Sequence, residues 1–150
     1  MQQSLQFEPN IIEKDGKKQI FDVIPKKFVA FTAEEFVRQY FIDFMIRTLN
    51  YSAGLMAVEK SVVINGMRQR ADILLYNRKG KPVMIVECKA PNIEIGQATI
   101  EQAARYNLSL GVKYLVITNC LTSYCVKLDY LEQKHELMSK FPTSEDVGNS

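Results

Sequence analysis

Two stretches of the chain carry apolar side chains at the spacing of an amphipathic helix. Residues 33–49 repeat apolar positions every three or four residues, follow Thr32 as a capping residue and begin with acidic side chains. Residues 97–110 are rich in helix-forming residues and are followed by Gly111, a residue type that ends helices. The pattern predicts one helix over 33–49 and a second over 97–110.

The other apolar positions lie in short runs rich in β-branched residues, which are typical of strands. The predicted strands cover residues 55–66, 68–77 and 81–90, which form a meander, and residues 113–119 and 123–130, which form a hairpin. Asn65-Gly66 is the turn between the first two runs. The order helix, three strands, helix, two strands predicts an α/β fold in which a mixed central β-sheet is flanked by helices.

Both flanks of this core carry weaker signals. Residues 10–23 place Asp15-Gly16 between two short runs, which predicts a hairpin or an extended arm. Residues 131–140 predict a short polar helix, and the last ten residues are expected to fray. The expected organisation is one domain over 1–150, with an arm at 1–31, a core at 32–130, and a short helix and flexible tail at 131–150.

Composition narrows the class of protein. With 47% hydrophobic residues, the 150-residue chain can bury one sizeable core, and no apolar run approaches the ~18 residues of a membrane span. The first residues lack the pattern of a secretory signal, so we expect a cytoplasmic protein that does not bind a membrane. The three cysteines have no metal-binding spacing with each other or with His135. A net charge of +2 does not by itself indicate a polyanionic partner.

Candidate chemistry lies at the end of the predicted strand 81–90. Because side chains alternate along a strand, Glu87 and Lys89 share one face and Cys88 lies on the other. The preceding strand carries Asp72 and runs antiparallel, so Asp72 and Glu87 can converge on one hard cation. Two carboxylates with waters suit Mg²⁺, and the backbone carbonyl of Cys88 is a further candidate ligand. The alternative is an ordinary surface ion pair between Glu87 and Lys89, worth ~0–1 kcal/mol.

The segments around these residues resemble a known family. They read EEFVRQ at 34–39, RADILLY at 70–76, GKPVMIVECKAP at 80–91, EQAARY at 101–106 and YLVITN at 114–119. In combination they resemble the PD-(D/E)XK nuclease superfamily and, more closely, the N-terminal nuclease domain of type I restriction enzyme R subunits. The resemblance covers roughly residues 32–130. It implies a restriction-endonuclease-like sandwich that hydrolyses phosphodiester bonds of DNA with Mg²⁺ or Mn²⁺.

By this resemblance Asp72 and Glu87 are metal ligands and Lys89 is the catalytic lysine, although Ala71 stands where the superfamily name has Pro. The family's QxxxY element is matched by two residues of the second predicted helix, Gln102 and Tyr106. Positions i and i+4 share a helical face, where an amide and a phenol can hydrogen-bond phosphate or water. The alternative for this pair is a tyrosine packed on the sheet and a glutamine that faces solvent.

The family also takes an acidic residue from its first helix. Helical angle places Glu34 nearer the apolar stripe of Val37 and Phe41, whereas motif register favours Glu35, which we choose. Alternatively, both acids only favour the N-terminus of the helix.

Basic residues surround the predicted meander and are candidates for contacts with the DNA backbone. They are Lys60, Arg68, Arg70, Arg78, Lys79 and Lys81. Such contacts would make binding depend on salt, but basic strand turns also serve solubility alone.

The sequence also indicates what the chain would need from partners. It contains no GxxxxGK[ST] phosphate loop, so it is expected either to act alone or to work with motor and specificity or methylation subunits encoded separately. A homodimer is plausible for cutting both strands. The alternative function is a non-catalytic nucleic-acid-binding or assembly module with a relict site. A small-molecule enzyme has no support, because neither GxGxxG nor GxSxG is present.

Overall fold

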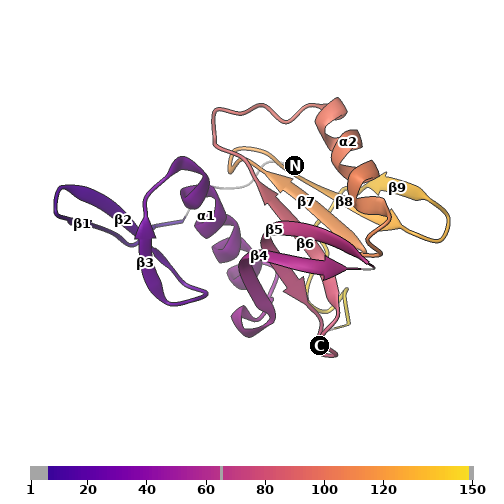
Figure 1. Cartoon of the computed structure of the whole chain (residues 1–150), viewed down its shortest axis with the longest axis horizontal. Coiled ribbons are helices and arrows are strands. Elements are labelled where there is room, and N and C mark those ends of the chain that lie inside the picture. Colours follow the sequence, from indigo (N-terminus) through magenta and orange to yellow (C-terminus); the bar gives the residue numbers. More distant parts are fainter. Residues whose placement is uncertain (1–6, 65, 149–150) are drawn as a thin grey trace.

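The computed structural model describes residues 7–64 and 66–148 (Figure 1). In chain order the elements are β1 (Ile11–Lys14), β2 (Lys17–Asp22), β3 (Lys27–Ala30), α1 (Ala33–Arg47), a short 3-10 turn (Ala53–Leu55), β4 (Met56–Ile64), β5 (Met67–Tyr76), β6 (Pro82–Cys88), α2 (Gln97–Leu108), β7 (Tyr114–Thr118), β8 (Ser123–Asp129) and β9 (Lys134–Leu137). Within these residues the strands form a three-stranded sheet, β1-β2-β3, and a six-stranded sheet, β4-β5-β6-β7-β8-β9.

The three-stranded sheet lies at one end of the molecule, on the far side of α1 from the larger sheet (Figure 1). Asp15 and Gly16 close the β1–β2 turn with φ values of 53° and 74°, which are those of the type I′ turn that Asp-Gly favours. The structure therefore has the predicted hairpin. The third strand, β3, was not predicted, because four residues are too few to show a clear alternation.

Helix α1 begins where the sequence predicts. The Thr32 hydroxyl accepts a hydrogen bond of 3.0 Å from the Glu35 amide, which caps the first turn. Val37, Phe41 and Met45 are fully buried and form the stripe that packs against the six-stranded sheet.

The six-stranded sheet is mixed, as predicted. β4-β5-β6 is an antiparallel meander, β6 and β7 are parallel, and β7-β8-β9 is antiparallel again. Helix α2 is the crossover that joins the parallel pair. Among the described residues, no helix has the length and apolar character needed to cross a membrane.

Alternate side chains of the central strands fill two separate cores. Ile73 and Val86 pack on the face that α1 covers, whereas Leu74 and Ile85 pack on the face that α2 covers. All five residues of β7 are buried, because this strand lies inside the sheet with both faces covered. The architecture is the predicted α/β sandwich.

The predicted helix over 131–140 is wrong, because this segment forms a turn and β9, which pairs antiparallel with β8. The turn is closed by Gln133 with a φ of 54° and by the Glu132 amide, which donates to Asp129 Oδ1 at 3.1 Å. All four β9 residues are exposed. No apolar alternation therefore marks the strand in the sequence, and pairing with β8 decides its conformation.

The expected flexible tail makes defined contacts in the part that the structure describes, and its flexibility stays a prediction. The Phe141 ring packs against Phe41 and Phe44 of α1, with ring centroids 5.8 and 5.3 Å apart. The Tyr51 hydroxyl donates a hydrogen bond of 2.6 Å to the Pro142 carbonyl. The C-terminal segment thus completes the core beneath α1.

Candidate active site

Strands β5 and β6 separate from each other at Asp72 and Glu87. Their antiparallel pairing ends with Ile73 opposite Val86 and does not continue to the next pair. Where it ends, Asp72 Oδ2 accepts a hydrogen bond of 2.7 Å from the Cys88 amide. The carboxylate takes the place of the missing strand carbonyl, which fixes Asp72 at the edge of β6.

The backbone of Cys88 faces the same gap. The Lys89 amide donates to the Thr118 carbonyl of β7 at 2.8 Å. Consecutive residues of a strand direct their backbone groups to opposite edges, so the N–H and C=O of Cys88 point away from β7 and toward Asp72. The Cys88 carbonyl therefore points toward the place where a cation beside Asp72 would lie. Its role as a metal ligand stays a prediction.

Glu87 and Lys89 lie side by side on one face of β6 and its extension, as the alternation predicts. Lys89 Nζ is 3.5 Å from Glu87 Oε2, and the two side chains are 34% and 44% exposed. The ion pair that the sequence left as an alternative therefore exists. Its partial exposure leaves both groups accessible to a ligand in solution.

A cavity of about 200 Å³ brings the two predicted metal ligands together. Asp72 and Glu87 line it with Arg70 and Asn107, and its remaining walls are apolar residues of β6 and β7: Ile85, Val86 and Leu115. Among the described residues, no group of three or more His, Cys, Asp or Glu side chains is arranged to hold a metal ion. The cavity therefore offers two carboxylates at most from side chains, with further donors to come from backbone, amide or water oxygens.

Asn107 is a polar residue of this cavity that the sequence analysis missed. It is 5% exposed, and its Nδ2 donates a hydrogen bond of 2.8 Å to the Ala103 carbonyl one turn earlier. Its Oδ1 is buried and has no hydrogen-bond partner among the described residues. Its place in the sequence could have indicated this, because Asn107 lies on the buried face of α2 together with Ala104 and Leu108.

Asp72 also lines a second, smaller cavity of about 70 Å³. Glu34, Glu35 and Glu59 line it with Arg38, and Thr32 and Cys88 complete its walls. The structure places both candidate acids of α1 near Asp72, but in this cavity rather than in the one that Glu87 lines.

The expectation from helical angle that Glu34 lies nearer the core is wrong. Glu34 is exposed, whereas Glu35 is 8% exposed. Both Glu35 oxygens accept hydrogen bonds from Arg38 Nη2, and Glu35 Oε1 also accepts one of 3.1 Å from Gln39 Nε2. Burial with Arg38 draws Glu35 inward, where both of its oxygens accept hydrogen bonds; its role as a metal ligand stays a prediction.

Arg38 is a buried cation that joins three elements. It is 4% exposed and pairs with Glu35 of its own helix, with Asp22 of β2 at 3.2 Å and with Glu59 of β4 at 3.5 Å. Burial alone lowers the pKa of Arg38, but hydrogen bonding to Glu35 and the charges of Glu35, Asp22 and Glu59 raise it above its usual value. Its Nη1 has no hydrogen-bond partner within the part of the chain that the structure describes. This cluster holds the N-terminal sheet on α1.

Gln102 and Tyr106 lie outside the cavity. Gln102 is exposed, and Tyr106 is 58% exposed. They share one face of α2, as predicted, but Asn107 is the α2 residue that lines the cavity with Asp72 and Glu87. Their part in catalysis stays a prediction.

The predicted basic group is divided between two places. Arg68 and Arg70 are exposed on β5, and Arg70 lines the cavity with Asp72. The β5–β6 turn carries the other three exposed residues, Arg78, Lys79 and Lys81. That turn precedes β6, whereas Glu87 lies near the end of β6, a separation of ~20 Å along a strand. The side chain of Lys60 lies outside the described part of the structure.

The cysteine thiols do not contribute a reactive group to the site. Cys88, Cys120 and Cys125 are free and buried. Burial and the nearby Asp72 charge raise the pKa of Cys88 well above its usual value, so its thiol stays protonated.

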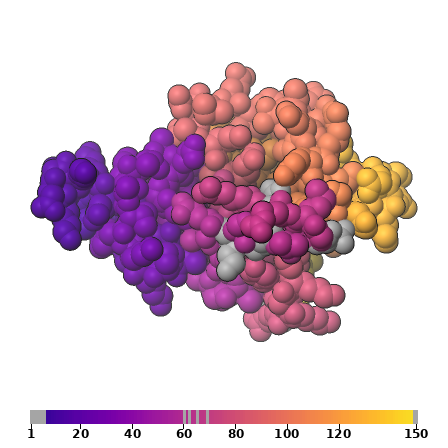
Figure 2. All heavy atoms as spheres, in the orientation of Figure 1, coloured from indigo at the N-terminus to yellow at the C-terminus, as the bar shows by residue number. Residues whose placement is uncertain are grey.

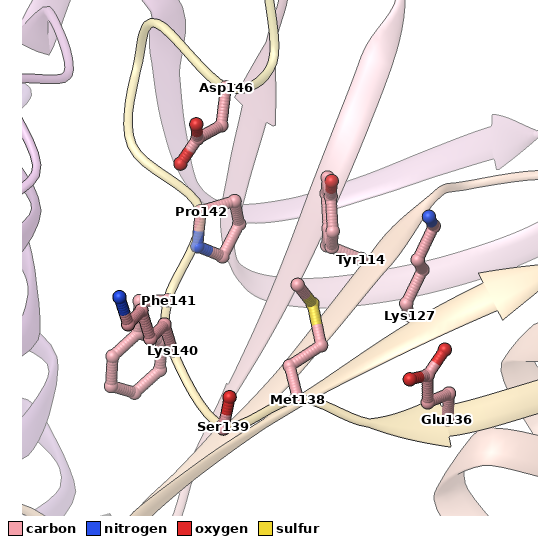
Figure 3. A pocket seen from close by; sticks show the side chains of 9 residues that line it. All are labelled: Tyr114, Lys127, Glu136, Met138, Ser139, Lys140, Phe141, Pro142 and Asp146. Atoms are coloured by element: carbon pink, nitrogen blue, oxygen red, sulfur yellow. The ribbon is translucent and has the colours of Figure 1, made fainter.

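A larger cavity of about 450 Å³ lies between the β7–β8–β9 sheet and the C-terminal segment (Figure 3). Lys127 and Glu136 line its strand side, and Lys140 and Asp146 line its side from the C-terminal segment. It shares no residue with the cavity of Asp72 and Glu87, and its charges of both signs indicate no single ligand.

Comparisons with known proteins show which family and which solved structure the chain resembles. A family model described as the type I restriction enzyme R protein N terminus matches residues 33–142. A solved fragment described as an HsdR subunit of a type I restriction enzyme from Vibrio vulnificus YJ016 has a similar fold, with a TM-score of 0.53 and 24% sequence identity. The match covers 78% of this chain and 24% of that chain, so this chain spans about a quarter of its length. Among curated proteins, no significant match is found.

Proposed function

The chain belongs to the family of type I restriction enzyme R protein N termini, and on that premise we propose that it is a Mg²⁺-dependent endonuclease module that hydrolyses phosphodiester bonds of DNA. One observation carries the proposal. Asp72 and Glu87 line one cavity at the point where β5 and β6 separate, with Lys89 beside Glu87. Two carboxylates and a lysine that meet where two strands separate supply the charges that phosphoryl chemistry uses.

The donors present fit Mg²⁺. The ion prefers hard oxygen ligands, keeps several waters, and is usually held by one or two carboxylates with phosphate oxygens. Asp72 and Glu87 supply the carboxylates, and the carbonyl of Cys88 faces the same gap. The partnerless Oδ1 of Asn107 adds a buried acceptor at the cavity. When bound, the metal would polarise the scissile phosphate and activate a water; Mn²⁺ has the same ligand preferences.

The remaining chemistry falls to residues of the chain itself. Lys89 places a cationic donor beside Glu87, where it can stabilise charge that develops on the phosphate. Arg70, exposed and at the wall of the cavity, is positioned to contact a phosphate of the substrate. Asp72 is held in place by the Cys88 amide before any ligand arrives, which limits the rearrangement that binding requires. Gln102 and Tyr106, which lie on α2 outside the cavity, would orient the DNA strand.

The role proposed for Glu35 is positional. Its carboxylate oxygens already accept hydrogen bonds from Arg38 and Gln39, so we assign it to holding α1 rather than to direct metal contact. DNA is the proposed substrate. Motor and specificity or methylation subunits encoded separately are the proposed partners, and a homodimer is a further arrangement that would cut both strands.

The competing function is a non-catalytic DNA-binding or assembly module with a relict site. A calorimetric titration with Mn²⁺ and Mg²⁺ separates the two. The proposal predicts metal binding that is lost in Asp72→Asn and Glu87→Gln and retained in Glu101→Gln, which removes a carboxylate that lines neither the cavity of Glu87 nor that of Glu35. DNA binding that is unchanged by EDTA, together with no metal binding, would support the relict module instead.

A further inference from the structure

The two faces of the N-terminal sheet carry different charges. In the strand register Lys14 lies opposite Lys17, and Phe21 lies opposite Phe28. Paired residues share a face and faces alternate along a strand, which assigns every residue of the sheet to one face. The outer face consists of Ile12, Lys14, Lys17, Gln19, Phe21, Phe28 and Ala30. None of these residues is acidic.

The opposite face is turned toward α1. On it Ile20 is fully buried, and Asp22 is 1% exposed and paired with Arg38. The other acidic strand residue, Glu13, lies on this inner face opposite Lys18. Both carboxylates of the strands thus lie on the inner face, the charged residues of the outer face are Lys14 and Lys17, and Asp15 lies in the turn between them.

The outer face combines two like charges that lie opposite each other with a pair of aromatic rings. Lys14 and Lys17 are exposed and directly opposite each other, and like charges in this position destabilise a sheet. Four residues along β2 from Lys17, on the same face and beyond Gln19, Phe21 pairs with Phe28; both rings are half-buried and contact each other edge to face, with ring centroids 5.2 Å apart. Cations and partly exposed aromatic rings on one sheet face are features of surfaces that bind unpaired nucleic-acid strands.

A buried ion pair connects this sheet to the candidate active site. Asp22 binds Arg38, and Arg38 lines the small cavity that Asp72 also lines. The sheet projects from the body of the molecule at the indigo end (Figures 1 and 2). Its strands precede residue 33, where the match to the family model begins, so that match does not include them.

We propose that the outer face of the N-terminal sheet binds an unpaired strand of the DNA on which the nuclease site acts. Lys14 and Lys17 contact phosphates, and the rings of Phe21 and Phe28 contact a base. An anion between the two lysines also removes the cost of placing them opposite each other. The inference rests on the proposed function, since it takes DNA as the ligand.

The first test measures binding of a labelled single-stranded oligonucleotide by fluorescence anisotropy, in EDTA and over a range of salt. The test variant is Lys14→Gln with Lys17→Gln. The matched control is Lys18→Gln with Lys27→Gln, which removes the same charge from the inner face of the same sheet. The association constant decreases as the salt concentration rises, and the proposal expects the slope of its logarithm against log salt concentration to become shallower by about 1.4 in the test variant. The control should change this slope by clearly less. Equal slopes for the two variants would overturn the proposal.

The second test separates ring contacts from charge. Phe28→Leu keeps an apolar side chain in the sheet, and its melting temperature reports whether the fold is retained. The proposal expects its affinity for a single strand to fall about tenfold and its affinity for a duplex to stay unchanged. Equal losses for the two DNA forms, or no loss for either, would overturn the base contact.

The two proposals fail in different ways. Because binding is measured in EDTA, it does not depend on cleavage. A chain that binds a single strand through Lys14 and Lys17 but cuts no DNA would overturn only the proposed function. A chain that cuts DNA while the Lys14→Gln and Lys17→Gln variant binds like the control would overturn only this inference.

Discussion

The Asp72 carboxylate accepts the amide proton of Cys88 at 2.7 Å, so a proposed metal ligand also completes the junction of β5 and β6. One carboxylate oxygen replaces a strand carbonyl, and the same residue lines the cavity that Glu87 lines. The site is therefore formed by the strands themselves, at the point where their pairing stops.

Replacing Asp72 should separate its two roles. In Asp72→Asn an amide oxygen can still accept from Cys88, so the free energy of unfolding should change by less than about 1 kcal/mol, while metal binding is lost. Asp72→Ala also loses the hydrogen bond and should be destabilised by about 1–3 kcal/mol. Urea denaturation beside a Mn²⁺ titration measures both effects. If Asp72→Asn binds Mn²⁺ as the unaltered chain does, Asp72 is not a ligand.

Arg38 should be among the most sensitive positions of the fold. Arg38→Met leaves Asp22 and Glu35 buried without their cation, which costs about 3–5 kcal/mol. The matched control is Arg47→Met, whose exposed i,i+4 pair with Asp43 is worth less than about 1 kcal/mol. Chemical denaturation of both variants gives the comparison. Similar losses for the two would mean that the buried cluster contributes no more than a surface pair.

Asn107 is predicted to support the metal through its partnerless oxygen. Asn107→Ala should weaken Mn²⁺ binding about 10- to 100-fold, which is the usual effect of losing a supporting group around a metal. Asn107→Asp keeps an oxygen at this position and should bind at least as tightly as the unaltered chain. Calorimetry measures both affinities. Equal affinities for the alanine variant and the unaltered chain would exclude Asn107 from the site.

Stability should fall in alkaline solution. Burial raises the pKa of Cys125 to about 12, whereas an unfolded cysteine ionises near about 8.5. Burial, with smaller effects of Cys120 and Asp43, likewise raises the pKa of Tyr40 to about 12, above the value of about 10 for an unfolded tyrosine. The unfolded chain then binds fewer protons than the folded chain, so each group lowers stability once the pH exceeds its unfolded pKa, by up to about 1.4 kcal/mol per pH unit.

Urea denaturation from pH 7.5 to 10.5 tests this expectation. The free energy of unfolding should be nearly constant up to about pH 8.5 and fall above it. Cys125→Ala should make the fall shallower, because one buried thiol is removed. A free energy that stays constant up to pH 10.5 would show that these groups are not held protonated by the fold.

The sequence predicts those parts of the fold that repeat with a regular period. The apolar stripe of α1 and the β-branched runs of β4 to β8 give their elements directly. Alternation along β6 likewise places Glu87 and Lys89 side by side, and the antiparallel meander brings Asp72 toward them. Local pattern is sufficient wherever the partners are neighbours along the chain or in adjacent strands.

Other features depend on contacts that no local pattern encodes. β9 is polar and exposed, so only its pairing with β8 makes it a strand. The Arg38 cluster joins Asp22 and Glu59, which lie on strands before and after α1, and it decides that Glu35 rather than Glu34 is buried. Helical angle alone suggests the opposite, because it counts apolar neighbours and omits a buried cation.

The central claim is that Asp72, Glu87 and Lys89 form a metal-dependent nuclease site, and nicking of supercoiled DNA tests it most directly. The purified chain is assayed with Mg²⁺, Mn²⁺ or EDTA, beside Lys89→Ala and a control, Lys134→Ala, which removes an exposed lysine of β9. The account predicts nicking in either metal, none in EDTA, full activity in Lys134→Ala and a loss of about 100-fold or more in Lys89→Ala. Nicking that persists in EDTA or in Lys89→Ala, or a chain that neither binds metal nor cuts DNA, would contradict it.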